Sequence, residues 1–229
     1  MINVELAQIA IAAPLIVFPL YLLIGMGDYT KSTKKSFNFL TDFPYEFNPR
    51  SQKNHGLHAL TVYFLAGIIT NISMFVNFYS AASEIVGLLI LSAFLTLAFY
   101  VFVYRIHTLT ASLEKSHLGR FYVMGLVLIL LSSVNGILFI NLSKGNEEMK
   151  NIILGLSIGM FIVSAASFII LLNPRLKNWA KLEKVVDEDG ASSLKRPKPF
   201  VLAFSEWLII FLSVISWLLA AISNYLLIK

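Results

Sequence analysis

Residues 50–65 read RSQKNHGLHALTVYFL, and within this stretch a polar, basic segment gives way to an apolar run. The apolar run continues without a charged side chain to about residue 79. A helix that rises about 1.5 Å per residue needs about 20 apolar residues to cross a hydrocarbon core of about 30 Å. The stretch therefore predicts a transmembrane helix that begins near His58, with Arg50, Asn54 and His55 at its polar mouth.

Five further apolar stretches of similar length occur elsewhere in the chain. Of the 229 residues, 57% are hydrophobic and only 14% are charged, and one water-soluble core cannot bury that much apolar surface. We therefore expect an all-α integral membrane protein with six transmembrane helices. The predicted spans are residues 6–26, 58–79, 85–106, 120–142, 152–173 and 200–228.

Lys and Arg are distributed unevenly between the predicted loops. Five lie in residues 27–57, three in 105–120 and seven in 174–200, whereas two lie in 143–151 and one is Lys229. Basic residues accumulate on the cytoplasmic side of membrane proteins, so the basic loops are predicted to be cytoplasmic and both termini to lie outside. In a bacterium the membrane would be the plasma (inner) membrane. The same rule accounts for the net charge of +5 without a nucleic-acid partner.

The predicted helices divide into two parts. Residues 1–142 form a four-helix transmembrane unit, and residues 143–229 add two helices joined by a long basic connection. In that connection, residues 175–187 are predicted to form an amphipathic interfacial helix, because apolar and basic residues recur there with helical spacing. The apolar face would carry Leu176, Trp179, Leu182 and Val186, and the polar face Lys177, Lys181 and Lys184.

The first long loop, residues 27–57, combines basic residues with closely spaced aromatic residues. Rings in such a setting favour the headgroup layer, where they are half buried and where cations meet anionic lipid. The loop is therefore predicted to lie against the membrane as an anchor. The other interpretation is a lid that covers a site at the helix mouths. The aromatic residues are Phe37, Phe39, Phe43, Tyr45 and Phe47.

Helix 200–228 carries Glu206, the one acidic residue well inside a predicted span. In hydrocarbon a carboxylate must find a partner, bind a proton or stay close to water. Arg105, near the end of helix 85–106, is a candidate partner. A ligand-binding or proton-binding role and a structural ion pair both fit this position.

Cysteine is absent, which excludes disulfides, thiolate metal sites and cysteine nucleophiles. The HxxH pair at 55 and 58 has no carboxylate close by in sequence, and haem-ligating histidines usually lie deeper in a span. Neither a metal site nor a haem is therefore expected. Histidines and arginines at helix mouths fit contacts with lipid headgroups or with an anionic ligand. All four histidines fall at such mouths: His55, His58, His107 and His117.

Four polar residues at these mouths follow a recognisable order. Arg50 and Asn54 precede the second helix, Arg105 lies near the end of the third, and Arg120 begins the fourth. This pattern, together with the outside N-terminus and the long cytoplasmic first loop, resembles the MAPEG superfamily, the membrane-associated proteins in eicosanoid and glutathione metabolism. The resemblance covers residues 1–142 only.

The resemblance implies a glutathione-handling enzyme that works as a trimer. Arg50 and Asn54 would help to hold glutathione at the cytoplasmic face, and Arg120 would be the catalytic residue that polarises its thiol. The chain departs from the family at Leu57, where the family has a glutamate, so the partner for the amino group of glutathione is missing. Glutathione is the one cofactor or substrate that the resemblance suggests.

The helix mouths together predict a basic, His-containing cytoplasmic rim that binds an anionic or amphipathic ligand, as in a glutathione- or lipid-handling enzyme. The alternative is a non-catalytic structural or assembly subunit of a larger membrane complex or homo-oligomer, for which the GxxxG spacing of Gly155 and Gly159 offers a contact surface. The lack of a midplane charge and of an internal repeat counts against a small transporter. Membrane lipids are expected partners in each case. The predicted ligand-binding residues are Arg50, Asn54, His55, His58, Arg105, His107 and Glu206.

Overall fold

The computed structural model describes residues 3–47, 56–108, 116–186 and 192–229. Six helices in these residues are long and apolar enough to cross a membrane, which confirms the predicted all-α membrane architecture at that level. Their bounds follow the predicted spans closely except at the end of the first helix. The helices are α1 (Val4–Thr33), α2 (Gly56–Phe78), α3 (Ser83–His107), α4 (Ser116–Ser143), α5 (Lys150–Leu171) and α6 (Val201–Ile228).

Helix α1 continues past its predicted end at residue 26 to Thr33. The apolar run stops near Gly27, but Tyr29 is buried and its ring meets that of Phe37 edge to face, with the centroids 5.0 Å apart. The helix ends at Lys34, whose backbone is left-handed and whose N–H donates to the carbonyl of Thr30. Tertiary contact therefore keeps the polar last turns of α1 helical.

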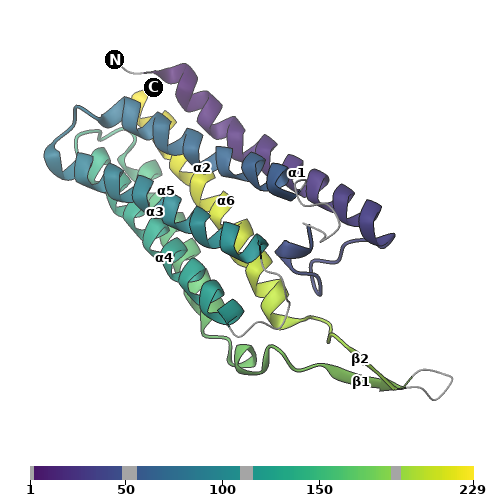
Figure 1. Ribbon diagram of the computed structural model, residues 1–229. Helices are drawn as coiled ribbons and strands as arrows, with labels where there is room; N and C mark the ends of the chain where they lie inside the picture. Colours follow the sequence, from purple (N-terminus) through teal and green to yellow (C-terminus); the bar gives the residue numbers. More distant parts are fainter. Residues whose placement is uncertain (1–2, 48–55, 109–115, 187–191) are drawn as a thin grey trace.

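Helix α6 is the central helix of the bundle and contacts α1, α2, α4 and α5 (Figure 1). It carries Trp207 and Trp217, the two largest of the fully buried side chains that the structure describes. Trp217 approaches α2 at Gly67, where an added Cβ would overlap both Trp217 and Tyr100. Tyr100 of α3 also donates to the Phe64 carbonyl of α2 at 2.7 Å. Because Gly67 has no side chain, α2, α3 and α6 can approach one another closely at this position.

Polar side chains inside the bundle pair with each other between helices. Ser92 of α3 donates to Asn135 of α4 at 2.6 Å, and the hydroxyls of Ser132 and Ser216 join α4 to α6 at 2.8 Å. Lipid offers such groups no partner, so these hydrogen bonds favour one arrangement of the helices. Both chain ends lie at the same end of the bundle (Figure 1).

The connection between α5 and α6 differs from the prediction. Instead of an amphipathic helix over 175–187, the chain forms a short 3-10 helix, η2 (Pro174–Asn178), followed by an antiparallel hairpin of β1 (Glu183–Val186) and β2 (Ser192–Lys195). Two adjacent valines in β1 favour a strand, and the ladder to β2 satisfies backbone groups that a helix would have bonded internally. The predicted helix is therefore wrong, and the hairpin projects beyond the bundle (Figure 1).

Candidate functional site

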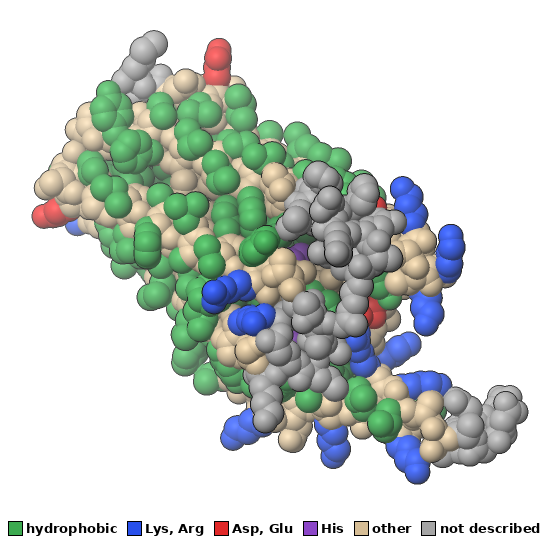
Figure 2. Space-filling model, in the orientation of Figure 1, with side chains coloured by type: hydrophobic (Ala, Val, Ile, Leu, Met, Phe, Trp, Pro, Cys, Tyr) green, Lys and Arg blue, Asp and Glu red, His purple; other side chains and the backbone are tan. Residues whose placement is uncertain are grey.

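The three predicted cytoplasmic loops meet at one end of the bundle, where α1, α3 and α5 finish and where α2, α4 and α6 begin. We call this the basic end. Figure 2 shows Lys and Arg side chains gathered there, whereas the flank of the bundle is largely apolar. A ligand site of the predicted kind would therefore lie at the basic end.

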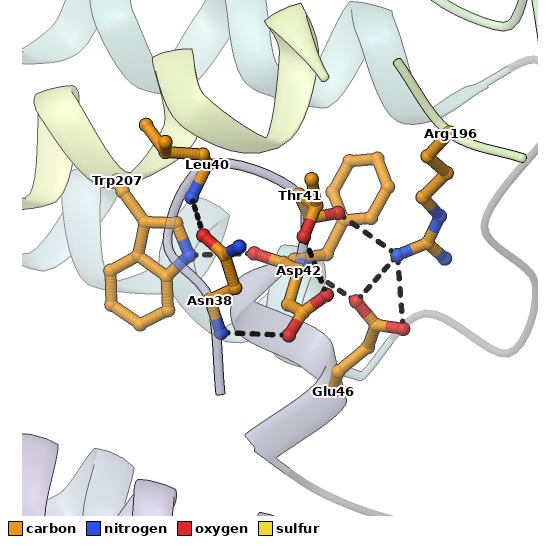
Figure 3. Close-up of polar contacts among 8 residues, drawn as sticks. Asn38, Leu40, Thr41, Asp42, Glu46, Arg196 and Trp207 are labelled. Carbon is orange, nitrogen blue, oxygen red and sulfur yellow. Dashed lines mark hydrogen bonds and ion pairs between the residues drawn. The ribbon is translucent and has the colours of Figure 1, made fainter. Parts of the chain in front are cut away.

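Residues 34–47, the lid segment, fold over the start of α6. Phe37 and Phe47 are buried, and their ring centroids lie 5.6 and 5.0 Å from that of Trp207. The indole N–H of Trp207 donates to the carbonyl of Asp42 at 2.9 Å (Figure 3). These aromatic residues therefore contact the protein itself, and the choice between an anchor and a lid stays a prediction.

A latch formed by Arg196 holds the lid segment down (Figure 3). The guanidinium donates to Glu46 Oε2 at 2.9 Å and to the carbonyl of Thr41 at 3.0 Å. It also lies over the rings of Phe43 and Phe200, 5.1 and 5.7 Å from their centroids. Burial alone would lower the pKa of Arg196, but the hydrogen bond and the charge of Glu46 outweigh burial and raise that pKa. The latch cation therefore stays protonated at physiological pH.

A buried histidine–carboxylate pair between α4 and α6 lies close to the lid segment. His117 Nε2 lies 2.5 Å from Glu206 Oε1, and both side chains are fully buried. The His117 ring packs against those of Phe43 and Trp179, with centroids 4.9 and 5.5 Å away. Among the described residues, Glu206 Oε2 has no hydrogen-bond partner. Such a pair can share a proton or hold α4 against α6, and removal of either side chain breaks this buried contact.

Arg105 is not the partner of Glu206, contrary to the prediction. Arg105 lies exposed in the last turn of α3, whereas His117 lies buried in the first turn of α4 and contacts Glu206. His117 is missing from the predicted ligand-binding residues, because its spacing in the sequence does not reveal that α4 and α6 begin side by side. The sequence feature that could have identified His117 is its position just inside an apolar helix, where a polar ring needs a hydrogen-bond partner.

Of the remaining predicted rim residues, the structure describes His107, Arg105 and Arg120, and these three differ in burial. His107 is buried in the core, where its Nδ1–H donates to Val103 O and its Nε2 accepts from Tyr21 O–H, both at 2.8 Å. Arg120 does lie beside Arg105, since its Nη1 donates to the Arg105 carbonyl at 3.4 Å. The residues that lie outside the described ones are Arg50, Asn54 and His55, together with the side chain of His58.

A hollow of about 450 Å³, the basic hollow, lies between η2, the hairpin and the start of α6. Its cations are Arg175, Lys181 and Lys198, and the rings of Trp179 and Phe200 form part of its wall. All three cations are exposed, and none takes part in an ion pair within the part of the chain that the structure describes. The basic hollow therefore offers positive charge that the protein itself leaves unneutralised.

Two further features of the basic hollow affect its electrostatics. Glu183 is the one acidic side chain among the described residues that line it. Helix α6 begins at its wall after Phe200, and no side-chain hydrogen bond caps this helix start. The positive end of the α6 dipole therefore adds to the three cations. No group of three or more His, Cys, Asp or Glu side chains able to hold a metal ion occurs in the described ranges.

Comparison with protein-family models, with curated proteins and with solved structures finds no match to this chain. The resemblance to the MAPEG superfamily stays a prediction that rests on Arg50, Asn54, Arg105 and Arg120.

Proposed function

We propose that this integral membrane protein binds an anionic, amphipathic ligand at its basic end and that this end faces the cytoplasm. The basic hollow carries the proposal, because Arg175, Lys181 and Lys198 there adjoin the rings of Trp179 and Phe200. An anionic group gains from three cations at once, and the apolar part of the same ligand can cover the rings. The distribution of Lys and Arg supports the orientation, with both termini outside.

The expected gain in affinity follows from the charges in the basic hollow. A single Lys or Arg near an anionic lipid surface contributes about 1 kcal/mol, and salt screens this contribution. Three cations opposed by Glu183 leave about 2 kcal/mol, or about 30-fold in affinity, in favour of an anionic over a neutral ligand. A preference of this size is measurable by titration.

The test compares two double variants that remove equal charge. The full chain is incubated in mixed micelles with phosphatidylglycerol and, separately, with phosphatidylcholine, and the bound lipid is counted. Arg175→Ala/Lys198→Ala should weaken phosphatidylglycerol binding about tenfold or more. Lys177→Ala/Lys184→Ala, which lies outside the basic hollow, should leave it within about twofold. Equal losses in both variants would mean that only overall charge matters, and the proposal would then be abandoned.

The orientation has its own test, which the cysteine-free chain makes simple. A cysteine in place of Ser80, between α2 and α3, should react with a membrane-impermeant thiol reagent from outside intact cells. A cysteine in place of Ser192, in β2, should not react. Labelling at Ser192 would place the basic end outside and reverse the proposed orientation.

A narrower form of the proposal is a MAPEG-like, glutathione-handling enzyme with Arg120 as its catalytic residue. It is supported by the contact of Arg120 with the backbone of Arg105, which puts two basic residues in one neighbourhood. Guanidinium groups suit both the carboxylates and the thiolate of glutathione. Arg120→Ala should weaken glutathione binding and leave phosphatidylglycerol binding unchanged. If the wild-type protein does not bind glutathione, this narrower form is excluded.

A second candidate function is that of a non-catalytic subunit in a larger membrane complex. Gly155 of α5 favours it, because this residue is exposed and an added Cβ would meet nothing within 4 Å. Gly159, by contrast, already lies against Leu219. An open small residue lets a second helix approach closely. Gly155→Leu should then lower the mass of the complex in mild detergent, and an unchanged mass would remove this candidate.

A further inference from the structure

A second cavity lies near the basic hollow on the same two elements, η2 and α6. It measures about 420 Å³ and lies between the end of α5 and the start of α6. We call it the apolar groove, because its lining is apolar apart from Asn173 and Ser205. Leu172 borders it at the end of α5, and Phe204 and Leu208 border it on α6.

The basic hollow and the apolar groove succeed each other along two elements of the chain. On α6, Val201 lines the hollow, and Ser205, four residues later on the same helix face, lines the groove. On η2, Pro174 lines the groove and its neighbour Arg175 lines the hollow. The two cavities are therefore adjacent, with the charged one at the end of α6 and the apolar one farther into the span.

The edge of the apolar groove is open to the surroundings of the bundle. Leu172 and Ile169 are 63% and 68% exposed at this edge, whereas Ser205 is only 3% exposed. In a membrane these exposed side chains meet hydrocarbon rather than water. A lipid can thus enter the groove sideways from the bilayer, whereas a soluble molecule can reach only the hollow.

We propose that the two cavities form one site for an anionic phospholipid, with its phosphate among the cations of the basic hollow and one acyl chain in the apolar groove. This inference rests on the proposed function and names the ligand class for the same site. Val201 and Leu208 are separated by about 10 Å along the axis of α6, so the groove holds the first part of a chain while the rest stays in the bilayer. The charge of the hollow and the apolar lining of the groove together match the two ends of such a lipid.

Two polar side chains in the basic hollow restrict the headgroup. Glu183 repels a second phosphate but accepts hydrogen bonds from hydroxyl groups, and the amide of Asn178 both donates and accepts. A phosphodiester that carries hydroxyl groups, such as phosphatidylglycerol, satisfies both side chains. The choline group of phosphatidylcholine offers no donor, so these two lipids are the discriminating probes.

The experiment separates the groove from the hollow. The purified full chain is titrated with dioleoyl phosphatidylglycerol, dioleoyl phosphatidylcholine and glycerol 3-phosphate, and occupancy is counted by native mass spectrometry. Leu208→Trp fills the apolar groove, and it should weaken phosphatidylglycerol binding about tenfold, because two or three methylene groups lose their contacts. Ile215→Trp places the same side chain at an exposed position on α6 outside the groove, and binding should stay near the wild-type value. Glycerol 3-phosphate should not compete with phosphatidylglycerol.

Any other result shows which of the two proposals, the two-part lipid site or the proposed function, is wrong. If Arg175→Ala/Lys198→Ala weakens phosphatidylglycerol binding and Leu208→Trp does not, the two-part site is overturned and the proposed function stands. If neither variant changes binding, both are overturned. Competition by glycerol 3-phosphate would assign the basic hollow to a soluble phosphate instead of a lipid. Leu172→Asn, at an exposed position on the groove edge, repeats the groove test without disturbing the core and should also weaken phosphatidylglycerol binding.

Discussion

Two regions of the basic end contain ionisable side chains, and the regions differ in what surrounds these side chains. In the closed region, His117 and Glu206 are fully buried and 2.5 Å apart. In the open region, Arg175, Lys181 and Lys198 line a hollow of about 450 Å³ and have no ion pair within the described residues. The two side chains of the closed region contact each other, whereas the cations of the open region are available to a ligand.

The difference between the two regions has a thermodynamic basis. A buried polar group that loses its hydrogen-bond partner keeps its desolvation cost, so a substitution in the closed region should lower the stability of the fold. An exposed cation is well solvated and contributes little to folding, so a substitution in the open region should alter binding only. Trp179 contacts both regions, since its ring packs against His117 and also lines the basic hollow.

The largest effect is expected from Glu206→Ala. This change leaves His117 buried without its carboxylate and should lower the free energy of unfolding by about 3–5 kcal/mol. Thermal unfolding in detergent, followed by tryptophan fluorescence, measures the loss. Glu206→Gln should recover part of it, because the amide can still bond to the imidazole.

The matched control for this prediction is Glu183→Ala in the open region. Glu183 is exposed, and its removal should leave the unfolding temperature unchanged. A Glu206→Ala variant that unfolds at the same temperature as Glu183→Ala would contradict the division into closed and open regions.

An intermediate effect is expected from Arg196→Ala, which removes the latch. Its contacts with Glu46 and Thr41 are charge-assisted but partly exposed. The free energy of unfolding should therefore fall by at most about 3 kcal/mol. Hydrogen exchange should rise in the lid segment, residues 34–47, and not in α5. Lys184→Ala, an exposed cation on the hairpin, serves as the control.

The same latch predicts a particular pH dependence. Because Glu46 raises the pKa of Arg196 above its ordinary value, the stability that this cation contributes is fully present below the ordinary value and is lost only above it. Protection of the lid segment should therefore stay constant between about pH 7 and about pH 10. A loss of protection within that range would show that another group holds the lid.

The smallest effect is expected from Lys181→Ala in the open region. The unfolding temperature should not change, while phosphatidylglycerol binding should weaken about fivefold, which corresponds to about 1 kcal/mol. Titration in low salt shows the difference best, because salt screens an exposed cation. A lower unfolding temperature with unaltered binding would mean that Lys181 belongs to the fold rather than to the site.

The positions of the membrane-spanning helices could be predicted from the sequence because hydropathy is a local property. Hydropathy predicts the ends of α2 and α6 within a few residues. In α1 the apolar run ends near Gly27, but the helix continues to Thr33, where the contact of Tyr29 with Phe37 stabilises its last turns. The hairpin that replaces the predicted helix over 175–187 shows the same limit. The apolar and basic residues there have helical spacing, but the chain forms the hydrogen-bonded ladder between β1 and β2 instead.

The candidate site was less predictable, because it depends on which helix ends adjoin. Glu206 was recognisable as a residue in need of a partner, but only the approach of α4 to α6 selects His117 over Arg105. Arg196 stood in a segment without periodicity, and its partner Glu46 lies 150 residues away in sequence. The cations of the basic hollow were visible only as a basic stretch, since a cavity is formed by packing and not by composition.

The basic hollow and the apolar groove are proposed to hold one anionic phospholipid between them. The most direct test uses phosphatidylglycerol with a photoactivatable diazirine in one acyl chain, with phosphatidylcholine of the same chain as the control. After irradiation, peptide mapping should find the phosphatidylglycerol crosslinks concentrated at residues 169–174 and 204–208, and Arg175→Ala/Lys198→Ala should reduce them. Crosslinks spread evenly over exposed apolar residues such as Phe94 and Leu97 of α3, and alike for both lipids, would contradict the claim.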